Sequence, residues 1–413
     1  MGGKYMNCIV AQSGGPTVAI NASLAGVIKG VIKSSSYDKI YGSVHGIQGV
    51  LREQFLDLSD STDEFIDKLA KSPAMYLGSC RFKLPDIDRD LAPYKTIFDI
   101  FYKMNIGAFF YIGGNDSMDT VDKLSAYAAS IGSDIRVIGV PKTIDNDLVH
   151  TDHTPGFGSA AKYVASSIRE IAYDTYIYDL KSVNIVEIMG RDAGWLTASS
   201  VLARNEYSLA PHMIYLPEVA FDKQQFITDL SVMVDKYKNV IVAVSEGIHD
   251  AYGNYISATS AVADKFGHAQ LSGAGKALEY LVKEELGIKV RSVEINVLQR
   301  CAAHMASKTD LDESFASGMF AVSLAAEGNT GLMVCLNRTG NHPYSYELTG
   351  VKVCEVANKA KDVPIEWITP DHHDVTSEML EYLRPLVLGE VKTNYKDGIA
   401  DYLDISHLTK PLK

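Results

Sequence analysis

Short apolar runs alternate with longer segments of helical periodicity along most of the chain. The apolar runs are long enough for buried strands and cover residues 8–11, 108–112, 136–140, 184–188, 240–244, 292–297 and 332–336. Apolar residues at helical spacing cover residues 18–32, 117–129, 159–171, 193–203, 272–284 and 311–324. Continuous apolar strands separated by helices predict parallel sheets covered on both faces. Right-handed crossovers between such strands then give a doubly wound α/β fold.

Length and patterning predict more than one domain. A chain of 413 residues exceeds the usual size of a single hydrophobic core. We find no linker rich in Pro, Gly or Ser and no internal repeat, so we expect two α/β lobes with the chain crossing between them more than once. Residues 336–413 are more polar, and we expect a C-terminal extension packed on the core.

Composition excludes several classes of protein. The chain carries 39 basic and 51 acidic residues, a net charge of −12, which disfavours nucleic-acid binding because phosphates require a basic face. No apolar run approaches the roughly 18 residues of a membrane helix, and the start of the chain lacks a secretory apolar region. Five scattered cysteines without a CxxC pair predict reduced thiols. We therefore expect a cytoplasmic protein with no nucleic-acid or membrane partner.

Glycines and polar residues follow four of the predicted strands. They form the stretches 13–15, 113–117, 141–147 and 189–192. Ligands of parallel α/β sheets bind beyond the carboxyl ends of the strands, where helix N-termini present their amide hydrogens. Taken singly, each stretch is also compatible with an ordinary turn, a surface loop or a salt bridge at a helix start.

The residue types in these stretches favour a metal-phosphate site. Lys142 and Thr143 stand beside Asp145 and Asp147 in one loop, and Arg191 is suited to bidentate phosphate recognition. The glycine spacings match neither GxGxxG nor GxxxxGK[ST], which disfavours a dinucleotide oxidoreductase and a P-loop enzyme.

Six stretches together carry a resemblance to a known family. SGGPTVAINAS, LGSCRF, GGNDSMDT, PKTIDNDL, IVEIMGRDAGWLT and VSEG occur in this order across roughly residues 5–335. The chain thereby resembles the phosphofructokinase family. The resemblance implies two doubly wound α/β/α lobes and phosphorylation of carbon 1 of fructose 6-phosphate. It also implies a mainly donor-binding lobe in 1–150, a mainly sugar-binding lobe in 151–335, and the C-terminal extension in 336–413.

Two positions indicate the phosphoryl donor. Family members that use ATP usually have Gly where this chain has Asp116 and Lys142, and the pair resembles the pyrophosphate-dependent branch. A carboxylate at Asp116 repels the α-phosphate of ATP, whereas Lys142 offsets charge on a departing phosphate. The resemblance therefore implies reversible transfer from pyrophosphate to the C1 hydroxyl. The alternatives are an ATP-dependent enzyme and a non-catalytic phosphosugar sensor; the intact Asp145, Thr143 and Arg191 argue against the sensor.

The resemblance implies a role for each site residue. Asp145 is the expected general base, and the expected catalytic set is Asp145, Lys142, Asp116, Thr143 and Arg191. Sugar phosphate binding is assigned to Thr143, Asp145, Met189, Gly190, Arg191, Glu246, Arg291 and Arg300. Pyrophosphate binding is assigned to Gly15, Arg81, Ser117 and Lys142.

Cofactor and assembly follow from the same resemblance. Mg²⁺ is expected, with Asn115 standing where the family usually has an aspartate ligand, and with Asp116, Asp145 or Asp147 able to share that role. One of the two phosphate-binding arginines comes from a neighbouring subunit in the family, so we expect a homodimer or homotetramer. The chain departs from the family pattern at Ser182 and Val297, where an arginine and a histidine are usual.

Overall fold

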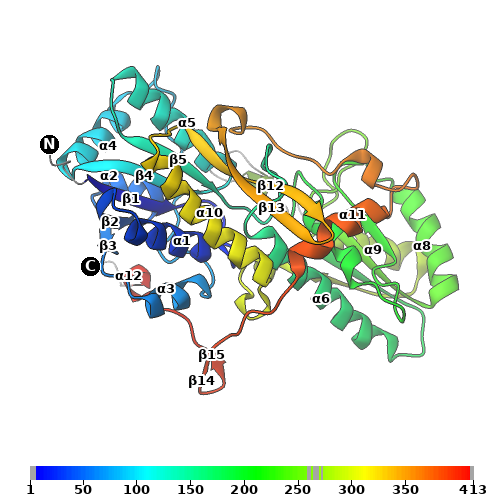
Figure 1. Cartoon of the computed structure of the whole chain (residues 1–413). Coiled ribbons are helices and arrows are strands. Elements are labelled where there is room, and N and C mark those ends of the chain that lie inside the picture. Colours follow the sequence, from blue (N-terminus) through cyan, green and yellow to red (C-terminus); the bar gives the residue numbers. More distant parts are fainter. Residues whose placement is uncertain (1–5, 258–261, 264–268, 271–272, 410–413) are drawn as a thin grey trace.

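Two β-sheets organise the chain in a computed structural model (Figure 1), which describes residues 6–257, 262–263, 269–270 and 273–409. The larger, seven-stranded sheet has the order β13-β12-β5-β4-β1-β2-β3. Its strands are β1 (Met6–Gln12), β2 (Tyr37–Ser43), β3 (Phe55–Asp57), β4 (Ile106–Gly113), β5 (Arg136–Pro141), β12 (Leu332–Asn341) and β13 (Tyr344–Lys352). Strands β2, β1, β4, β5 and β12 run parallel, and the two edge strands β3 and β13 are antiparallel to their neighbours.

Side chains of the central strand β4 alternate between two cores. Phe109 and Tyr111 pack on one face, and Phe110 and Ile112 pack on the other. The first face is covered by α2 (Gly46–Leu51), α4 (Ala92–Lys103) and α5 (Asn115–Ser130). The second face is covered by α1 (Ile20–Lys33), α3 (Asp63–Ala70) and α10 (Lys308–Ala326). Both faces are thus buried, as continuous apolar strands require.

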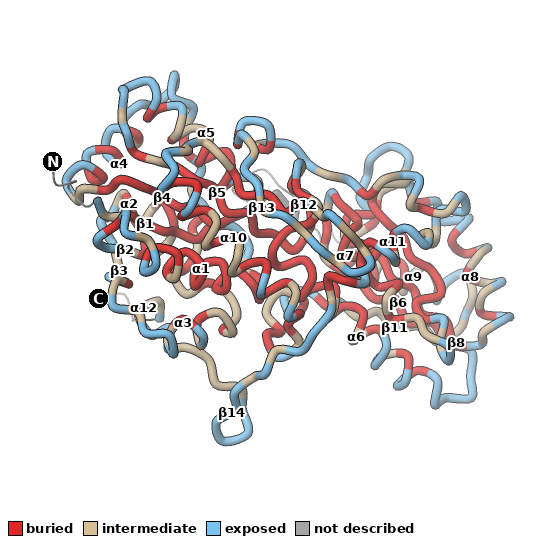
Figure 2. Tube along the Cα trace, viewed as in Figure 1, coloured by how far each residue is buried: buried red, intermediate tan, exposed pale blue. Residues whose placement is uncertain are grey.

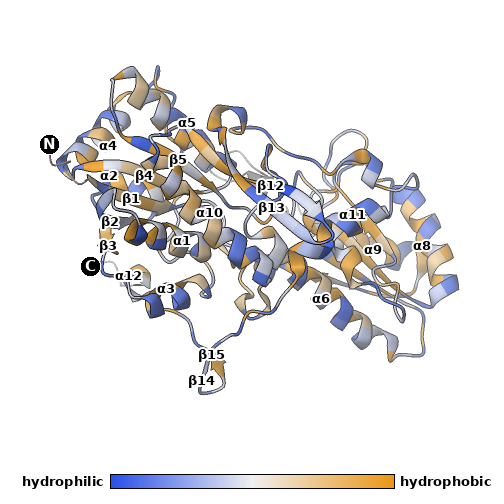
Figure 3. Ribbon diagram, in the orientation of Figure 1, coloured by the Kyte–Doolittle hydropathy of each residue, from blue (hydrophilic) through white to orange (hydrophobic). Residues whose placement is uncertain are grey.

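The second lobe repeats this three-layer arrangement. Its four-stranded parallel sheet has the order β11-β6-β8-β7, with β6 (Ser182–Ile188), β7 (Met213–Tyr215), β8 (Asn239–Ser245) and β11 (Lys289–Glu294). One face is covered by α6 (Phe157–Tyr176), α7 (Trp195–Ala198) and η1 (Ser199–Ala203), the other by α8 (Lys223–Tyr237) and α9 (Ala274–Leu286). Figure 2 shows the buried cores of both lobes, and Figure 3 shows apolar and polar faces on α6 and α8. None of the described helices has the length and apolar character needed to cross a membrane.

The C-terminal extension contacts both lobes. After β13, η4 (Val353–Glu355) packs on the first lobe, whereas α11 (Ser377–Leu383) packs against the second. The tail then returns to the first lobe (Figure 1), where His407 Nε2 lies 2.7 Å from the Tyr76 carbonyl oxygen. The remaining short elements are η2 (Asn296–Arg300), η3 (Ala303–Met305), η5 (Ile365–Trp367), η6 (Arg384–Val387), β9 (Val262–Ala263), β10 (Ala269–Gln270), β14 (Tyr395–Lys396), β15 (Ile399–Ala400) and α12 (Ser406–Thr409).

The doubly wound α/β fold predicted from the sequence is confirmed, with local differences. The helix expected over 193–203 divides into α7 and η1. The strand expected over 292–297 ends at Glu294, because the chain turns into η2, which contains Val297. The helix expected from 272 begins at Ala274; residue 272 lies outside the described residues.

Candidate active site

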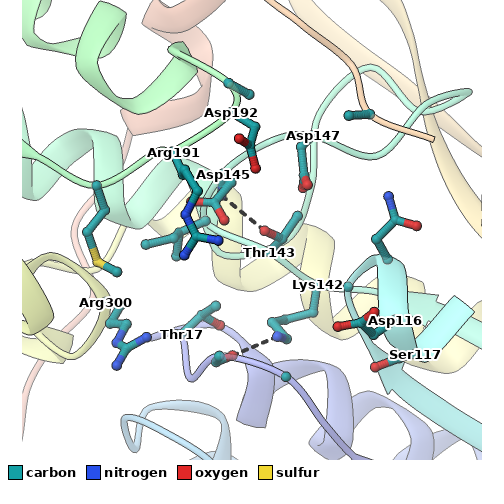
Figure 4. Close-up of a pocket in the computed structure, with 18 of the residues that line it drawn as sticks. Thr17, Asp116, Ser117, Lys142, Thr143, Asp145, Asp147, Arg191, Asp192 and Arg300 are labelled. Carbon is teal, nitrogen blue, oxygen red and sulfur yellow. Dashed lines mark hydrogen bonds between the residues drawn. The ribbon is translucent and has the colours of Figure 1, made fainter. Parts of the chain in front are cut away.

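The four glycine and polar stretches meet in one cleft between the lobes. Its volume is about 540 Å³. Figure 4 shows that Thr17, Lys142, Asp145, Arg191 and Arg300 approach one another across it. The lining residues are Gly14, Gly15, Pro16, Thr17, Lys83, Gly114, Asn115, Asp116, Ser117, Lys142, Thr143, Ile144, Asp145, Asp147, Met189, Arg191, Asp192, Ala193, Glu246, Arg300, Asn358, Lys359 and Ala360.

Lys142 is a buried cation on the side of the cleft that the first lobe forms. Its side chain is 2% exposed, and Nζ donates a 2.6 Å hydrogen bond to the Gly15 carbonyl oxygen. Gly14 has φ +79°, and a Cβ there would lie 3.1 Å from Nζ, so this tight turn favours glycine. Burial lowers the pKa of Lys142 to about 8, although Asp145 and Asp147 act in the opposite direction. The ammonium group is therefore held against the loop that was predicted to bind phosphate.

Asp145 and Asp147 project from a turn that is held by a hydrogen bond within the loop and by another to Tyr382. The Asp145 amide donates to Thr143 Oγ1 at 3.1 Å. Between the two acids, Asn146 adopts φ +56°, and its side chain donates to the Tyr382 hydroxyl at 2.7 Å. Burial, together with the neighbouring Asp147 and Glu246 carboxylates, raises the pKa of Asp145 to about 7; burial also raises the pKa of Asp147. A carboxyl group with a raised pKa in a cleft is suited to accepting a proton near neutral pH.

The second lobe contributes Met189, Arg191 and Glu246 to the cleft lining, from the ends of β6 and β8, and the Gly190 backbone holds these two ends together. Ser245 Oγ donates to the Gly190 carbonyl oxygen at 2.6 Å, and the Gly190 amide donates to Glu246 Oε1 at 3.3 Å. Close approach explains the glycine after Glu246, because a Cβ at Gly247 would lie 1.7 Å from the Arg191 carbonyl oxygen. These bonds fix the backbone from which the Arg191 side chain enters the cleft.

Several buried polar atoms around the cleft have no hydrogen-bond partner among the described residues. They are Ser117 Oγ, Asp147 Oδ1, Arg191 Nε and Arg300 Nε. Arg300 also lies beside the glycine loop, since a Cβ on Gly15 would be 3.5 Å from its Nη1. Buried polar groups are normally satisfied, so these donors and acceptors fit a site that receives an anion together with a cation.

Three predicted binding residues, Arg81, Gly190 and Arg291, do not line this cleft. Gly190 lies in the chain between Met189 and Arg191, which do line it. Arg81 is exposed and does not line the cleft, whereas Lys83 from the same loop does. Arg291 is half exposed on the outer surface of the second lobe, where its Nη1 lies 3.4 Å from Asp174 Oδ2. Ser182 lies near Arg291 at the start of β6, and Val297 is 48% exposed on η2. One chain therefore assembles most, but not all, of the predicted residues.

The Asn115 side chain bonds to the C-terminal extension. Its Oδ1 accepts from the Asn358 amide and its Nδ2 donates to the Lys359 carbonyl oxygen, both at 2.5 Å. Among the described residues, no group of three His, Cys, Asp or Glu side chains is arranged to hold a metal ion. The unpartnered Asp147 Oδ1 and the Asp116 carboxylate lining the same cleft are nevertheless the hard oxygen donors that Mg²⁺ prefers.

Sequence reasoning missed several residues that line the cleft. Thr17 and Asp192 line the cleft and lie within two of the motif stretches. Their position beside predicted site residues was therefore a signal that could have identified them. Lys83 comes directly after the LGSCRF stretch. Asn358, Lys359 and Ala360 come from the extension, where no local motif marks them.

Comparison with known proteins defines the class of this chain. The phosphofructokinase family profile matches residues 7–323, and the chain belongs to this family. A protein of Methylococcus capsulatus named pyrophosphate–fructose 6-phosphate 1-phosphotransferase is 38% identical over 98% of this chain and 97% of its own length. A protein of the same name from Rhodospirillum rubrum is 42% identical over 92% of this chain and 93% of its own length. The crystal structure of a pyrophosphate-dependent phosphofructokinase from Nitrosospira multiformis superposes with a TM-score of 0.88, at 38% identity, over 97% of this chain and 96% of that one.

Proposed function

We propose that this protein transfers a phosphoryl group from pyrophosphate to the C1 hydroxyl of fructose 6-phosphate, giving fructose 1,6-bisphosphate and phosphate. The observation that carries the proposal is the buried Lys142 ammonium beside Gly15, with Asp116 on the same side of the cleft. A buried cation stabilises a departing phosphate, and the Asp116 carboxylate repels the longer, more charged chain of a nucleoside triphosphate. The names of the relatives support this reading. The donor and its product are both inorganic phosphates of similar energy, so the reaction is reversible.

Asp145 acts as the general base in this proposal. Its carboxylate accepts the proton of the C1 hydroxyl as that oxygen attacks the phosphorus. Arg191 and Thr143 lie beside it in the cleft and offset charge on the moving phosphoryl group. Glu246, Met189 and Gly190 shape the sugar side, and Arg300 supplies a cation for the sugar phosphate. On the donor side, Lys142, Ser117 and Gly15 receive pyrophosphate.

Asp147 and Asp116 are the residues that fit a magnesium ion. Members of this family generally need a divalent metal, and Mg²⁺ is the ion we propose. When bound, it would neutralise charge on the pyrophosphate oxygens. Asp147 presents an unpartnered buried oxygen toward this part of the cleft, and the Asn115 amide is already bonded to the 358–359 backbone.

We also propose that the site is completed by a second copy of the chain. Arg291 faces outward from the second lobe and is absent from the cleft lining of its own chain. A two-fold assembly can place the same residue of each subunit in the site of the other. We propose a homodimer, or a homotetramer built from such dimers, in the cytoplasm.

An assay of the purified protein tests the proposed reaction. Fructose 1,6-bisphosphate should form from fructose 6-phosphate, pyrophosphate and Mg²⁺, and its formation should stop when EDTA removes the metal. The reverse reaction, with phosphate added, should yield pyrophosphate. Tight binding of fructose 6-phosphate without turnover in either direction would favour a phosphosugar sensor instead.

A further inference from the structure

Segment 358–361 lies outside the family motifs, and its first three residues line the cleft. It lies past residue 323, where the match to the family profile ends. Asn358, Lys359 and Ala360 nevertheless line the cleft beside Asn115 and Asp116 at the start of α5. The C-terminal extension therefore supplies a wall on the donor side of the site.

Asn115 holds this segment with both ends of its amide. The oxygen accepts from the Asn358 amide and the nitrogen donates to the Lys359 carbonyl, each at 2.5 Å. An aspartate, the residue usual in the family at this position, could accept the first bond but could not donate the second. Asn358 has φ +60°, and its side chain donates to Asp119 Oδ1 at 2.9 Å, which adds a third bond to α5.

The segment is anchored on either side of this contact. Val356 is fully buried in the core of the first lobe. At the other end, the Lys361 amide donates to the Asp147 carbonyl at 2.8 Å, and its Nζ donates to the Asp152 carbonyl at 2.8 Å. The segment thus spans from the start of α5 to the turn that carries Asp145 and Asp147.

We propose that Asn115 is a positioning residue that docks segment 358–361, and that the docked segment limits the donor to two phosphates. This inference rests on the proposed function, because it assigns the α5 side of the cleft to pyrophosphate. A donor held by Lys142 and Ser117 meets Asn358, Lys359 and Ala360 if it continues past the α5 N-terminus. The asparagine at 115 is then explained by docking and not by metal binding.

Hydrogen exchange of the full-length protein tests the docking. Asn115→Ala removes both bonds, and Asn394→Ala changes an exposed asparagine elsewhere in the extension as a control. Two lost hydrogen bonds predict about tenfold faster exchange of the Asn358 amide and its neighbours in Asn115→Ala only. Unchanged exchange in Asn115→Ala would overturn the docking.

Donor selectivity tests the wall. With Asn115→Ala, the KM for pyrophosphate should rise about five- to tenfold, with kcat and the KM for fructose 6-phosphate nearly unchanged. Inorganic tripolyphosphate, a longer donor analogue without a nucleoside, should inhibit the wild type weakly and the variant about fivefold more strongly relative to pyrophosphate. If hydrogen exchange increased in Asn115→Ala but inhibition by tripolyphosphate relative to pyrophosphate stayed as in the wild type, segment 358–361 would not limit the length of the donor.

A magnesium titration separates docking from metal binding. Asn115→Asp should lower the half-saturating Mg²⁺ concentration if residue 115 is a ligand, and should leave it unchanged if Asn115 only docks the segment. A lowered value would overturn our assignment. If kcat/KM of the wild type with ATP equalled or exceeded that with pyrophosphate, the proposed function would fail, whereas the exchange experiment would still report on docking.

Discussion

The two ends of the cleft differ in how completely one chain builds them. At the donor end, Lys142 is 2% exposed and bonded to the glycine loop, and the C-terminal extension supplies a wall. At the sugar end, Arg191 and Arg300 enter the cleft, but Arg291 lies half exposed on the outer surface. If the proposed roles hold, donor chemistry is a property of the single chain, whereas full sugar phosphate binding depends on the proposed assembly.

The largest effect is expected where the two ends meet, at Asp145. Asp145→Ala should lower kcat by about 10²–10⁴-fold, because a general base acts in the transition state. The affinity for fructose 6-phosphate, measured by calorimetry, should change little. A variant that retained kcat and raised KM would make Asp145 a binding residue of the sugar end.

Loss of Lys142 should affect the donor end alone. Lys142→Gly removes a buried cation contact, and kcat/KM for pyrophosphate should fall by about 10²–10³-fold. No gain in ATP use is expected from this change, because Asp116 remains. Initial rates with varied pyrophosphate give the test, and wild-type kinetics in this variant would mean that loop 141–147 does not hold the donor.

Arg291→Ala should weaken only the sugar end. Loss of a charge-assisted bond predicts a rise of about 10–100-fold in the KM for fructose 6-phosphate, with the KM for pyrophosphate unchanged. Arg89→Ala, at an exposed surface arginine, is the matched control.

Coexpression can show which subunit uses Arg291. A mixed dimer of Arg291→Ala and Asp145→Ala chains keeps one site with both residues, so about half of the wild-type activity per mixed dimer is expected. No recovery in isolated mixed dimers would place Arg291 outside the site of the partner.

The pH dependence of the donor end gives a further test. The pKa of Lys142 is lowered to about 8, and the ammonium form is the one that binds phosphate. The kcat/KM for pyrophosphate should therefore decline above about pH 8, by roughly tenfold per unit. In Lys142→Arg, where the guanidinium stays charged, this alkaline decline should move to higher pH. A profile identical in both proteins would assign the decline to another group.

The fold was predictable where burial is continuous along the sequence. Strand β4 is buried at every position and was expected from its apolar run. The edge strand β13 was not, because its exposed and partly buried residues alternate and its sequence is largely polar. Strand β2 was missed for a similar reason, since Asp38 and Lys39 interrupt its apolar pattern.

The site was predictable where its residues are neighbours in sequence. Lys142, Thr143 and Asp145 share one loop, so their types and order indicated phosphate chemistry. Residues 358–360 reach the cleft through contacts that Asn115 makes with backbone atoms 243 and 244 positions away. Backbone partners leave no signature in side-chain identity, so sequence patterns could not reveal this wall.

The claim that pyrophosphate is the donor is tested most directly by the ratio of kcat/KM for pyrophosphate to kcat/KM for ATP. Both values are measured on one preparation with saturating fructose 6-phosphate and Mg²⁺. The buried Lys142 and the Asp116 carboxylate predict a ratio of at least about 10², the factor attached to one buried cation contact. A ratio of one or less would contradict the account and make the protein an ATP-dependent enzyme of the same fold.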